Sequence, residues 1–436
     1  MKSRSKKLLI ASFFLYLFSE SIHAQDNPFV TWSLDSCITY ARENNIQILK
    51  NQLLMDEAEI NLKEAKAAFF PSLTFASSQQ YAHENSGTEK NSYAGSYGLD
   101  ASMTLYNGGR NVNTVRKQKL GIENALSNYR AIGNSVEIAI IKAYYQILYA
   151  HASVETNRGI VETSLKELER SGKLLKAGTI SKVDLAQVES QYNSEVYQLV
   201  VSETAEKEAI LNLKQLLELD LNESFTPRFT ASEEVLPAIP DRDEVVEIAL
   251  ATLPELKAAQ SEIEMARLSK SIAKGERLPT VSLGGLVGTG HTTRSDYNLG
   301  RQLDSGRNER VGISVSVPIY SNRQIKSKIE RSDLQIINTQ LSLQNSVKEV
   351  SNTIATLHLD AVSAQSRLKA AAVQLLSAEE SYELMLQKYN LGMQSAVDLL
   401  VEKNNLLSAI QNKIQAQYTL LLNIRLLEFY RNQHPN

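Results

Sequence analysis

The chain has 436 residues, a formal net charge of −3 and one cysteine, Cys37. A single cysteine excludes an intramolecular disulfide, and 46 basic against 49 acidic side chains give no excess of positive charge that would favour nucleic acid. No stretch approaches the roughly 18 consecutive apolar residues of a transmembrane helix, so a membrane protein of this sequence would have to cross the bilayer with strands closed into a barrel.

Residues 1–24 are typical of a secretory signal peptide. A basic start is followed by an apolar core over 8–18 and by Ala24, a small residue before the predicted cleavage at Gln25. Cys37 lies too far downstream of that cleavage to accept a lipid, so no lipid anchor is expected. Removal of the peptide leaves an exported chain with a net charge of roughly −6.

A helix is predicted over about 33–68, with Ser33 as its N-cap and apolar residues recurring every three to four positions. The same arrangement returns at about 241–275, where Asp241 and Glu244 have the spacing of a capping box. A proline lies a few residues after each segment and ends it.

Alternation of apolar with small or polar residues predicts two β-hairpins, with strands at about 73–81 and 93–105 and again at about 281–287 and 311–319. One face of each strand is apolar and the other is small or polar, as in strands with lipid outside and a wet lumen inside. A soluble two-faced sheet would show the same alternation, so the pattern alone leaves both open. Tyrosines lie near the strand ends, where membrane interfaces favour aromatic residues: Tyr81, Tyr93, Tyr106, Tyr297 and Tyr320.

Long helices follow the hairpins at about 111–174 and about 324–389, and each would extend roughly 95 Å. Shorter helices return along them at about 182–221 and about 396–430, after glycine-containing turns. Antiparallel helices of this length must bury apolar stripes against their neighbours, as coiled coils do. The predicted fold class is therefore mainly α with a membrane β part.

These elements are duplicated in the sequence. The segment 176–185 returns as 390–399, about 214 positions later, whereas Pro71 returns as Pro279 after only about 208. The extra residues of the second copy therefore lie in its hairpin, whose loop at about 290–309 is long and charged. We expect a first repeat at 25–225, a linker at 226–240, a second repeat at 241–430 and a tail at 431–436.

Four strands per chain are too few to close a membrane barrel, which needs at least about eight. The strands must therefore be shared between chains. Two chains would supply about eight strands and three chains about twelve. The pattern predicts an oligomer without choosing between these numbers.

In order, spacing and duplication, the segments resemble the outer-membrane efflux channels of the TolC type. The resemblance rests on the opening of the first helix at 32–45 and on the strand-to-helix junction at 105–110. It rests also on the turns at Gly178 and Gly392, each followed by Val-Asp-Leu, and it covers nearly the whole mature chain.

The resemblance implies a homotrimer in the outer membrane of a Gram-negative bacterium. Three chains would share a barrel of about twelve strands, and their helices would form a long periplasmic α-barrel with a gated tip. The implied partners are outer-membrane lipid, a periplasmic adaptor (membrane fusion) protein and an inner-membrane pump of the RND, ABC or MFS class. Such a channel is the passive exit duct of a tripartite efflux or type I secretion system, with no enzymatic activity and no cofactor.

The helix tips are the candidate gate. Both read Ser-x-x-Asp, from Ser181 to Asp184 and from Ser395 to Asp398, which is the spacing of a capping box near the positive helix end. By resemblance, Asp398 matches a carboxylate that projects into the closed periplasmic mouth, where three copies would form an anionic ring that attracts cations. Asp184 matches its partner on the first tip, and Tyr389 matches a tyrosine that helps to hold the closed state.

The match departs from the family in three places. Gln394, a candidate constriction residue, stands where a well-known member has an arginine, and Val401 stands where it has a second ring aspartate. A gate here would then rely on hydrogen bonds, packing and one charged ring. Thr104 stands where the family often has a proline, as Pro318 does in the second copy. The exposed turn residues are candidate adaptor contacts, although glycine also simply ends a helix: Gly178, Thr179, Ile180, Gly392, Met393 and Gln394.

Other signals favour no chemistry. The glycine-rich segment 284–290 lacks the Lys-Ser/Thr end of a phosphate loop and alternates as a strand. The histidines are scattered without ligand spacing, so no metal site is expected, and neither a nucleophile elbow nor paired catalytic carboxylates stand out. The alternative function is a periplasmic or surface coiled-coil protein without a pore, which would have no need of two amphipathic hairpins.

Overall fold

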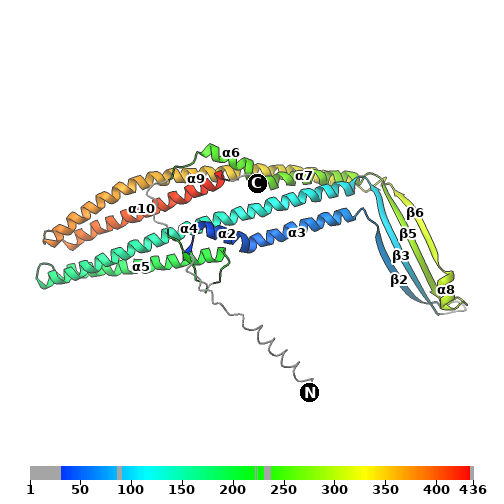
Figure 1. Cartoon of the computed structure of the whole chain (residues 1–436), viewed down its shortest axis with the longest axis horizontal. Coiled ribbons are helices and arrows are strands. Elements are labelled where there is room, and N and C mark those ends of the chain that lie inside the picture. Colours follow the sequence, from blue (N-terminus) through cyan, green and yellow to red (C-terminus); the bar gives the residue numbers. More distant parts are fainter. Residues whose placement is uncertain (1–30, 86–90, 221, 223, 230–236, 433–436) are drawn as a thin grey trace, which may run out of the picture.

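The computed structural model describes residues 31–85, 91–220, 222, 224–229 and 237–432. The predicted signal peptide at 1–24, residues 86–90 of the first hairpin loop and residues 230–236 of the predicted linker lie outside these residues. The molecule is elongated, with helices along most of its length and the four long strands, β2, β3, β5 and β6, grouped at one end (Figure 1). None of the described helices is long and apolar enough to cross a membrane.

Two halves of the chain repeat one order of elements, except that the two-residue strands β1 and β4 occur only in the first half and a short helix, α8, only in the second. The first half contains β1 (Thr31–Trp32), α2 (Leu34–Asn44), α3 (Ile46–Ala67), β2 (Ser72–His83), β3 (Asn91–Asn107), α4 (Arg110–Lys176), α5 (Lys182–Leu216) and β4 (Thr226–Pro227). The second half contains α6 (Arg242–Thr252), α7 (Pro254–Gly275), β5 (Thr280–Thr292), α8 (Leu299–Ser305), β6 (Asn308–Ser316), α9 (Gln324–Asn390) and α10 (Ala396–Arg431).

The helices predicted at about 33–68 and about 241–275 are each broken in the middle. The prediction of one continuous helix in each segment was therefore wrong. Asn45 is extended (φ −67°, ψ 126°), and its side chain caps α3 by accepting from two backbone N–H groups. Leu253 is extended because Pro254 follows it, and proline crowds a helical residue before it. The predicted caps Ser33 and Asp241 are confirmed, since each side chain accepts from an N–H of the first turn.

The four long strands form one antiparallel sheet in the order β2–β3–β5–β6. Phe75 lies opposite Leu99, and Leu99 lies opposite Val287, so the predicted apolar residues share one face. Within the described chain, β2 and β6 each pair on one side only. The sheet therefore has two open edges.

Two details of the second hairpin were not predicted. Its long loop contains the short helix α8, which is tied to β5 by a hydrogen bond from Thr289 Oγ1 to the carbonyl of Leu303 (2.5 Å). Strand β6 ends at Ser316, short of the expected residue 319, because Pro318 cannot donate to a strand ladder.

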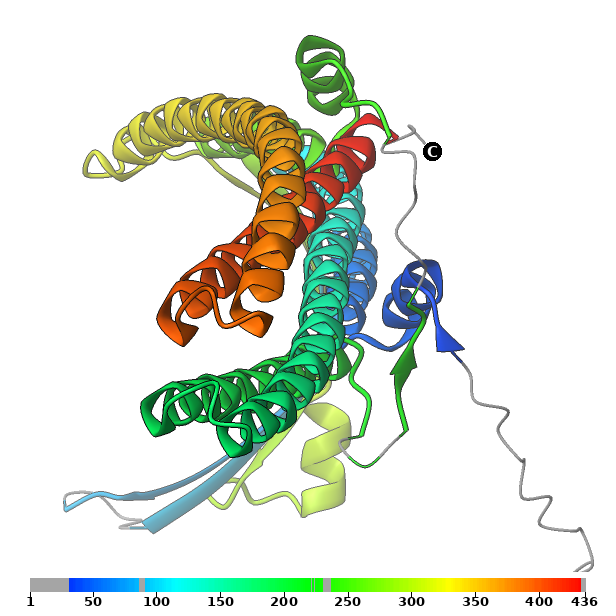
Figure 2. The same ribbon diagram turned by 90° about the vertical axis from the view of Figure 1, so that its left-hand side faces the viewer.

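Helices α4 and α9 each have 67 residues and would extend about 100 Å. Small or polar buried residues recur in α4 at every seventh position, which favours left-handed coiling of the helices. Viewed from the end where these helices turn, the α4–α5 and α9–α10 hairpins lie side by side (Figure 2). The residues in this α4 series are Ala143, Ala150, Asn157, Ser164 and Ser171.

Two apolar clusters fill the middle of the helical body. One packs Ile140 and Ile147 of α4 against Leu213 of α5, and the other packs Ile354 of α9 against Leu427 of α10. A third, smaller cluster lies at the tips, and it is described with the candidate gate. The core is therefore divided along the length of the molecule.

Candidate gate at the helix tips

Both long helices end in the same glycine turn. Gly178 (φ 75°) follows α4 and Gly392 (φ 70°) follows α9, a left-handed conformation that side chains rarely adopt. The N–H of Thr179 donates to the carbonyl of Leu174 (3.1 Å), and the N–H of Met393 donates to that of Lys388 (2.9 Å). These six-residue bonds are those of a Schellman motif, so the glycines end the helices.

Capping boxes begin both return helices, as the Ser-x-x-Asp spacing predicted. The N–H of Ser181 donates to Asp184 Oδ2 (2.9 Å), and the N–H of Asp184 donates to Ser181 Oγ (3.1 Å). The equivalent distances between Ser395 and Asp398 are 3.3 and 3.2 Å. Each serine hydroxyl also donates to its aspartate at 2.7 Å.

The two tips meet in the small apolar cluster of Val188, Tyr389 and Leu399, and Asp184 lies close to it. The hydroxyl and N–H of Ser181 hold the pKa of the Asp184 carboxyl below its usual value, and the backbone N–H of Ala396 lowers it further. Ala396 belongs to the second tip, so the first tip carries a carboxylate that faces the start of α10. Asp398, in contrast, is exposed.

Tyr389 also links the two hairpins. Its side chain is buried among the apolar tip residues Val188 and Leu399, and its hydroxyl lies 3.2 Å from Ser171 Oγ on α4. Gln394 is exposed on the turn between α9 and α10. Of the four predicted gate residues, Tyr389 is buried and Asp184 is half-buried. Asp398 and Gln394 are exposed.

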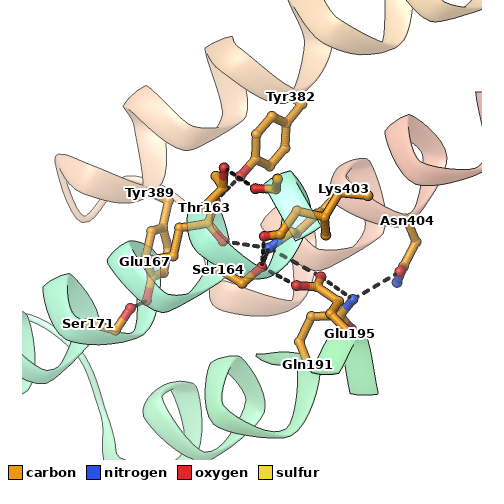
Figure 3. Close-up of polar contacts among 12 residues, drawn as sticks. Thr163, Ser164, Glu167, Ser171, Gln191, Glu195, Tyr382, Tyr389, Lys403 and Asn404 are labelled. Atoms are coloured by element: carbon orange, nitrogen blue, oxygen red, sulfur yellow. Dashed lines mark hydrogen bonds and ion pairs between the residues drawn. The ribbon is translucent and has the colours of Figure 1, made fainter. Parts of the chain in front are cut away.

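A buried polar cluster lies next to these residues, and the sequence did not reveal it (Figure 3). The Nζ of Lys403 lies 2.7 Å from Glu167 Oε2 and 3.2 Å from Glu195 Oε1. It lies 2.5 Å from Ser164 Oγ. The hydroxyl of Ser164 donates to Glu195, and that of Tyr382 donates to Glu167. We call these five residues the Lys403 cluster.

The members of the Lys403 cluster come from both hairpins: Ser164 and Glu167 from α4, Glu195 from α5, Tyr382 from α9 and Lys403 from α10. The Lys403 and Glu195 side chains are each 5% exposed and the Glu167 side chain 12%. Burial, followed by the neighbouring Glu167 carboxylate, raises the pKa of Tyr382, so its hydroxyl stays a donor.

A heptad count could have indicated part of this cluster. Glu195 lies seven residues after the buried Val188 in α5, and Lys403 lies seven residues after the buried Ala396 in α10. A charged residue at such a position faces the seam between helices. The count gives no partner, however, because the partner belongs to another helix.

No group of three or more His, Cys, Asp or Glu residues that could hold a metal occurs among the described residues. His151 instead pairs with Glu206 (2.7 Å) and stacks on Phe229, with ring centroids 3.6 Å apart. The arrangement at the tips consists of hydrogen bonds, ion pairs and apolar contacts between two hairpins, which can hold or release a conformation.

The sequence model described as outer membrane efflux protein matches residues 37–218 and 245–429. The chain belongs to the outer membrane efflux protein family. Escherichia coli outer membrane protein TolC is 22% identical over 400 residues, covering 88% of this chain and 78% of TolC. Outer membrane efflux protein BepC of Brucella suis is 20% identical over 395 residues, covering 89% of this chain and 83% of BepC.

Solved structures show the same fold. The Campylobacter jejuni CmeC outer membrane channel matches with a TM-score of 0.79 and 17% identity, covering 92% of this chain and 86% of CmeC. The outer-membrane channel OprN matches with a TM-score of 0.77 and 19% identity, covering 92% and 90%. Family membership places this efflux protein in the outer membrane as a channel, and it favours this function over the coiled-coil protein without a pore.

Proposed function

We propose that the protein is a homotrimeric exit duct that passes substrates passively across the outer membrane. The observation that carries an oligomer is the pair of open sheet edges, β2 and β6, and similarity to the TolC-type channels favours three copies. Unpaired strand edges are unstable within lipid, where each backbone polar group needs a partner. Pairing the β6 edge of one copy with the β2 edge of the next satisfies both edges, and three copies give a barrel of about twelve strands.

We propose that the helix tips form the gate of this duct. Asp398 is exposed beside the α9–α10 turn, so three copies around an axis would present an anionic ring. Asp184 and Tyr389 would hold the two tips of one chain together, since each contacts the other hairpin. Gln394 lies next to the ring and supplies no charge to it.

The same turns are proposed contacts for a periplasmic adaptor. Met393 is 69% exposed, and the α9–α10 turn that contains it lies at one end of the molecule (Figure 1). Thr179 holds the equivalent place on the first turn, followed by Ile180. A partner that covered both turns would bury this apolar surface.

The experiment for the proposed function is reconstitution of the full chain from outer membranes. We expect a heat-sensitive trimer on gel electrophoresis and discrete conductance steps in planar lipid bilayers. A monomer that washes off membranes with urea, and that adds no conductance, would contradict the proposal. Cross-linking in cells from cysteines placed at Thr179 and Met393 then identifies the adaptor. Purifying that adaptor and identifying the inner-membrane pump that comes with it gives the pump class.

A further inference from the structure

In the Lys403 cluster, every N–H of the lysine has an acceptor, and two carboxylates face one ammonium group. An ammonium group has three N–H donors, and those of Lys403 have three acceptors: Ser164, Glu167 and Glu195. Two carboxylates therefore share one buried cation. Buried carboxylates without a cation are costly, so both glutamates depend on Lys403.

An open groove lies on the surface beside this cluster. This groove has a volume of about 240 Å³, and it is lined by residues of α4 and α10 that include Lys403, and by Tyr382 of α9. The lining also includes the apolar residues Ile160, Leu406, Leu407 and Ile410. Beside this groove, the hairpins are joined by the Lys403 cluster together with the apolar contacts of Tyr382 and Leu406.

The cluster exists in one copy of the duplication only. At the offset of about 214 residues that relates the copies, Ser381 takes the place of Glu167, Ala409 that of Glu195 and Glu189 that of Lys403. Ser381 instead bonds Glu402 of its own hairpin (3.0 Å). We call the contact between a first and a second hairpin a joint. A joint built from the equivalent residues Ser381, Ala409 and Glu189 has no buried lysine.

We propose that Lys403 is a positioning residue of the gate, which fixes α10 against the α4–α5 hairpin of the same chain and keeps the tips in the arrangement seen here. This inference rests on the proposed trimeric channel. In that trimer, each second hairpin would also meet the first hairpin of the next copy. The joint within a chain then has the buried cation and the joint between chains lacks it, so the two joints differ in strength.

The first test is conductance of the full chain in planar bilayers. Lys403→Met leaves Glu167 and Glu195 buried without a cation, so we expect the hairpins to separate and the open fraction to rise about tenfold, the change that about 1.4 kcal/mol produces. Lys388→Met is the matched control, because Lys388 is exposed on α9 near the same tip, and it should conduct as the native chain does.

A charge-neutral variant separates positioning from general damage to the fold. Combining Lys403→Met with Glu167→Gln and Glu195→Gln removes the buried charges together, so it should lower the open fraction back toward the native value. All variants should remain trimers by gel mobility. Native conductance in trimeric Lys403→Met, or an equally raised conductance in the triple variant, would overturn the inference.

Cross-linking gives a readout that does not depend on channel activity. Gln191 of α5 donates to Asn404 of α10 (3.3 Å), so cysteines at both positions span the joint, and the native Cys37 is buried. A short thiol cross-linker should join this pair several-fold more slowly after Lys403→Met than in the native background. Unchanged cross-linking would overturn the role of Lys403 even if the native chain forms no channel, whereas absent native conductance with slowed cross-linking would count against the proposed function alone.

Discussion

The middle of the helical body and the tips are held together by different interactions. In the middle, Ile147 and Leu213 are fully buried within continuous apolar clusters. At the tips, the hairpins meet through the Lys403 cluster and a small apolar cluster around Tyr389. Regions with few apolar contacts open at lower free-energy cost than a packed core. The comparison therefore assigns stability to the middle and movement to the tips.

The largest effect should follow truncation in the middle. Ile147→Ala removes a fully buried side chain, and such a change costs about 2–5 kcal/mol because it leaves a cavity. Val200→Ala on the exposed face of α5 should change stability by less than about 0.5 kcal/mol. Chemical denaturation followed by circular dichroism measures both. If Ile147→Ala instead left stability intact and raised conductance, the assignment of the middle as a rigid frame would fail.

A smaller effect is expected from a glycine at the tip. Gly392→Ala meets no neighbouring atom, but its positive φ costs about 1–2 kcal/mol in any residue with a Cβ. Gly133→Ala in the interior of α4 also meets open space, and there alanine should stabilise the helix by up to about 1 kcal/mol. Limited proteolysis at the tips should quicken in the first variant only. Equal cleavage rates in both would mean that the turn is not under this conformational constraint.

The sequence predicted what depends on neighbours in the chain. The capping boxes at Ser181 and Ser395 are read from a spacing of three residues, and the strands from alternation. The break at Leu253 was also readable, since Pro254 disfavours a helical residue before it, but the continuous apolar pattern outweighed that signal. The break at Asn45 was harder to predict, because asparagine is common on the polar face of a continuous helix.

The Lys403 cluster could not be predicted in the same way. Its residues lie on four helices, and Glu167 and Lys403 are 236 positions apart. Heptad spacing places a residue at a seam between helices without naming the helix on the other side. The tip residues found by resemblance and the cluster found in the structure are thus complementary, since only the first group has a recognisable local pattern.

Asp398→Ala tests whether the exposed tip carboxylate lines the mouth of the duct. Removing three like charges from a narrow opening should raise conductance at the gate and weaken block by multivalent cations. Asp184→Ala is the comparison, because Asp184 faces the second tip through Ala396 and should loosen the contact without removing the cation site. Planar bilayer recordings with and without a trivalent cation measure both effects. Unchanged conductance and block in Asp398→Ala would contradict the anionic ring.

The smallest effect concerns pH and the contact of Asp184 with the second tip. Hydrogen bonds from Ser181 lower the pKa of this carboxyl from its ordinary value of 3.8, so ionised Asp184 stabilises the folded tip. The carboxyl therefore has a lower pKa in the folded tip than in the unfolded chain. Its contribution to stability is fully present above the unfolded pKa and is lost as the pH falls through the folded pKa, that is, below about pH 4. Limited proteolysis of the tips with an acid-active protease should therefore become faster as the pH is lowered through that range.

The Asp184→Asn variant should be cleaved faster than the native chain at neutral pH, and its cleavage rate should change less on acidification. The control is Asp56→Asn, at an exposed site on α3, which should behave as the native chain does. A native acid response in Asp184→Asn would show that the tips respond to acid through other carboxylates.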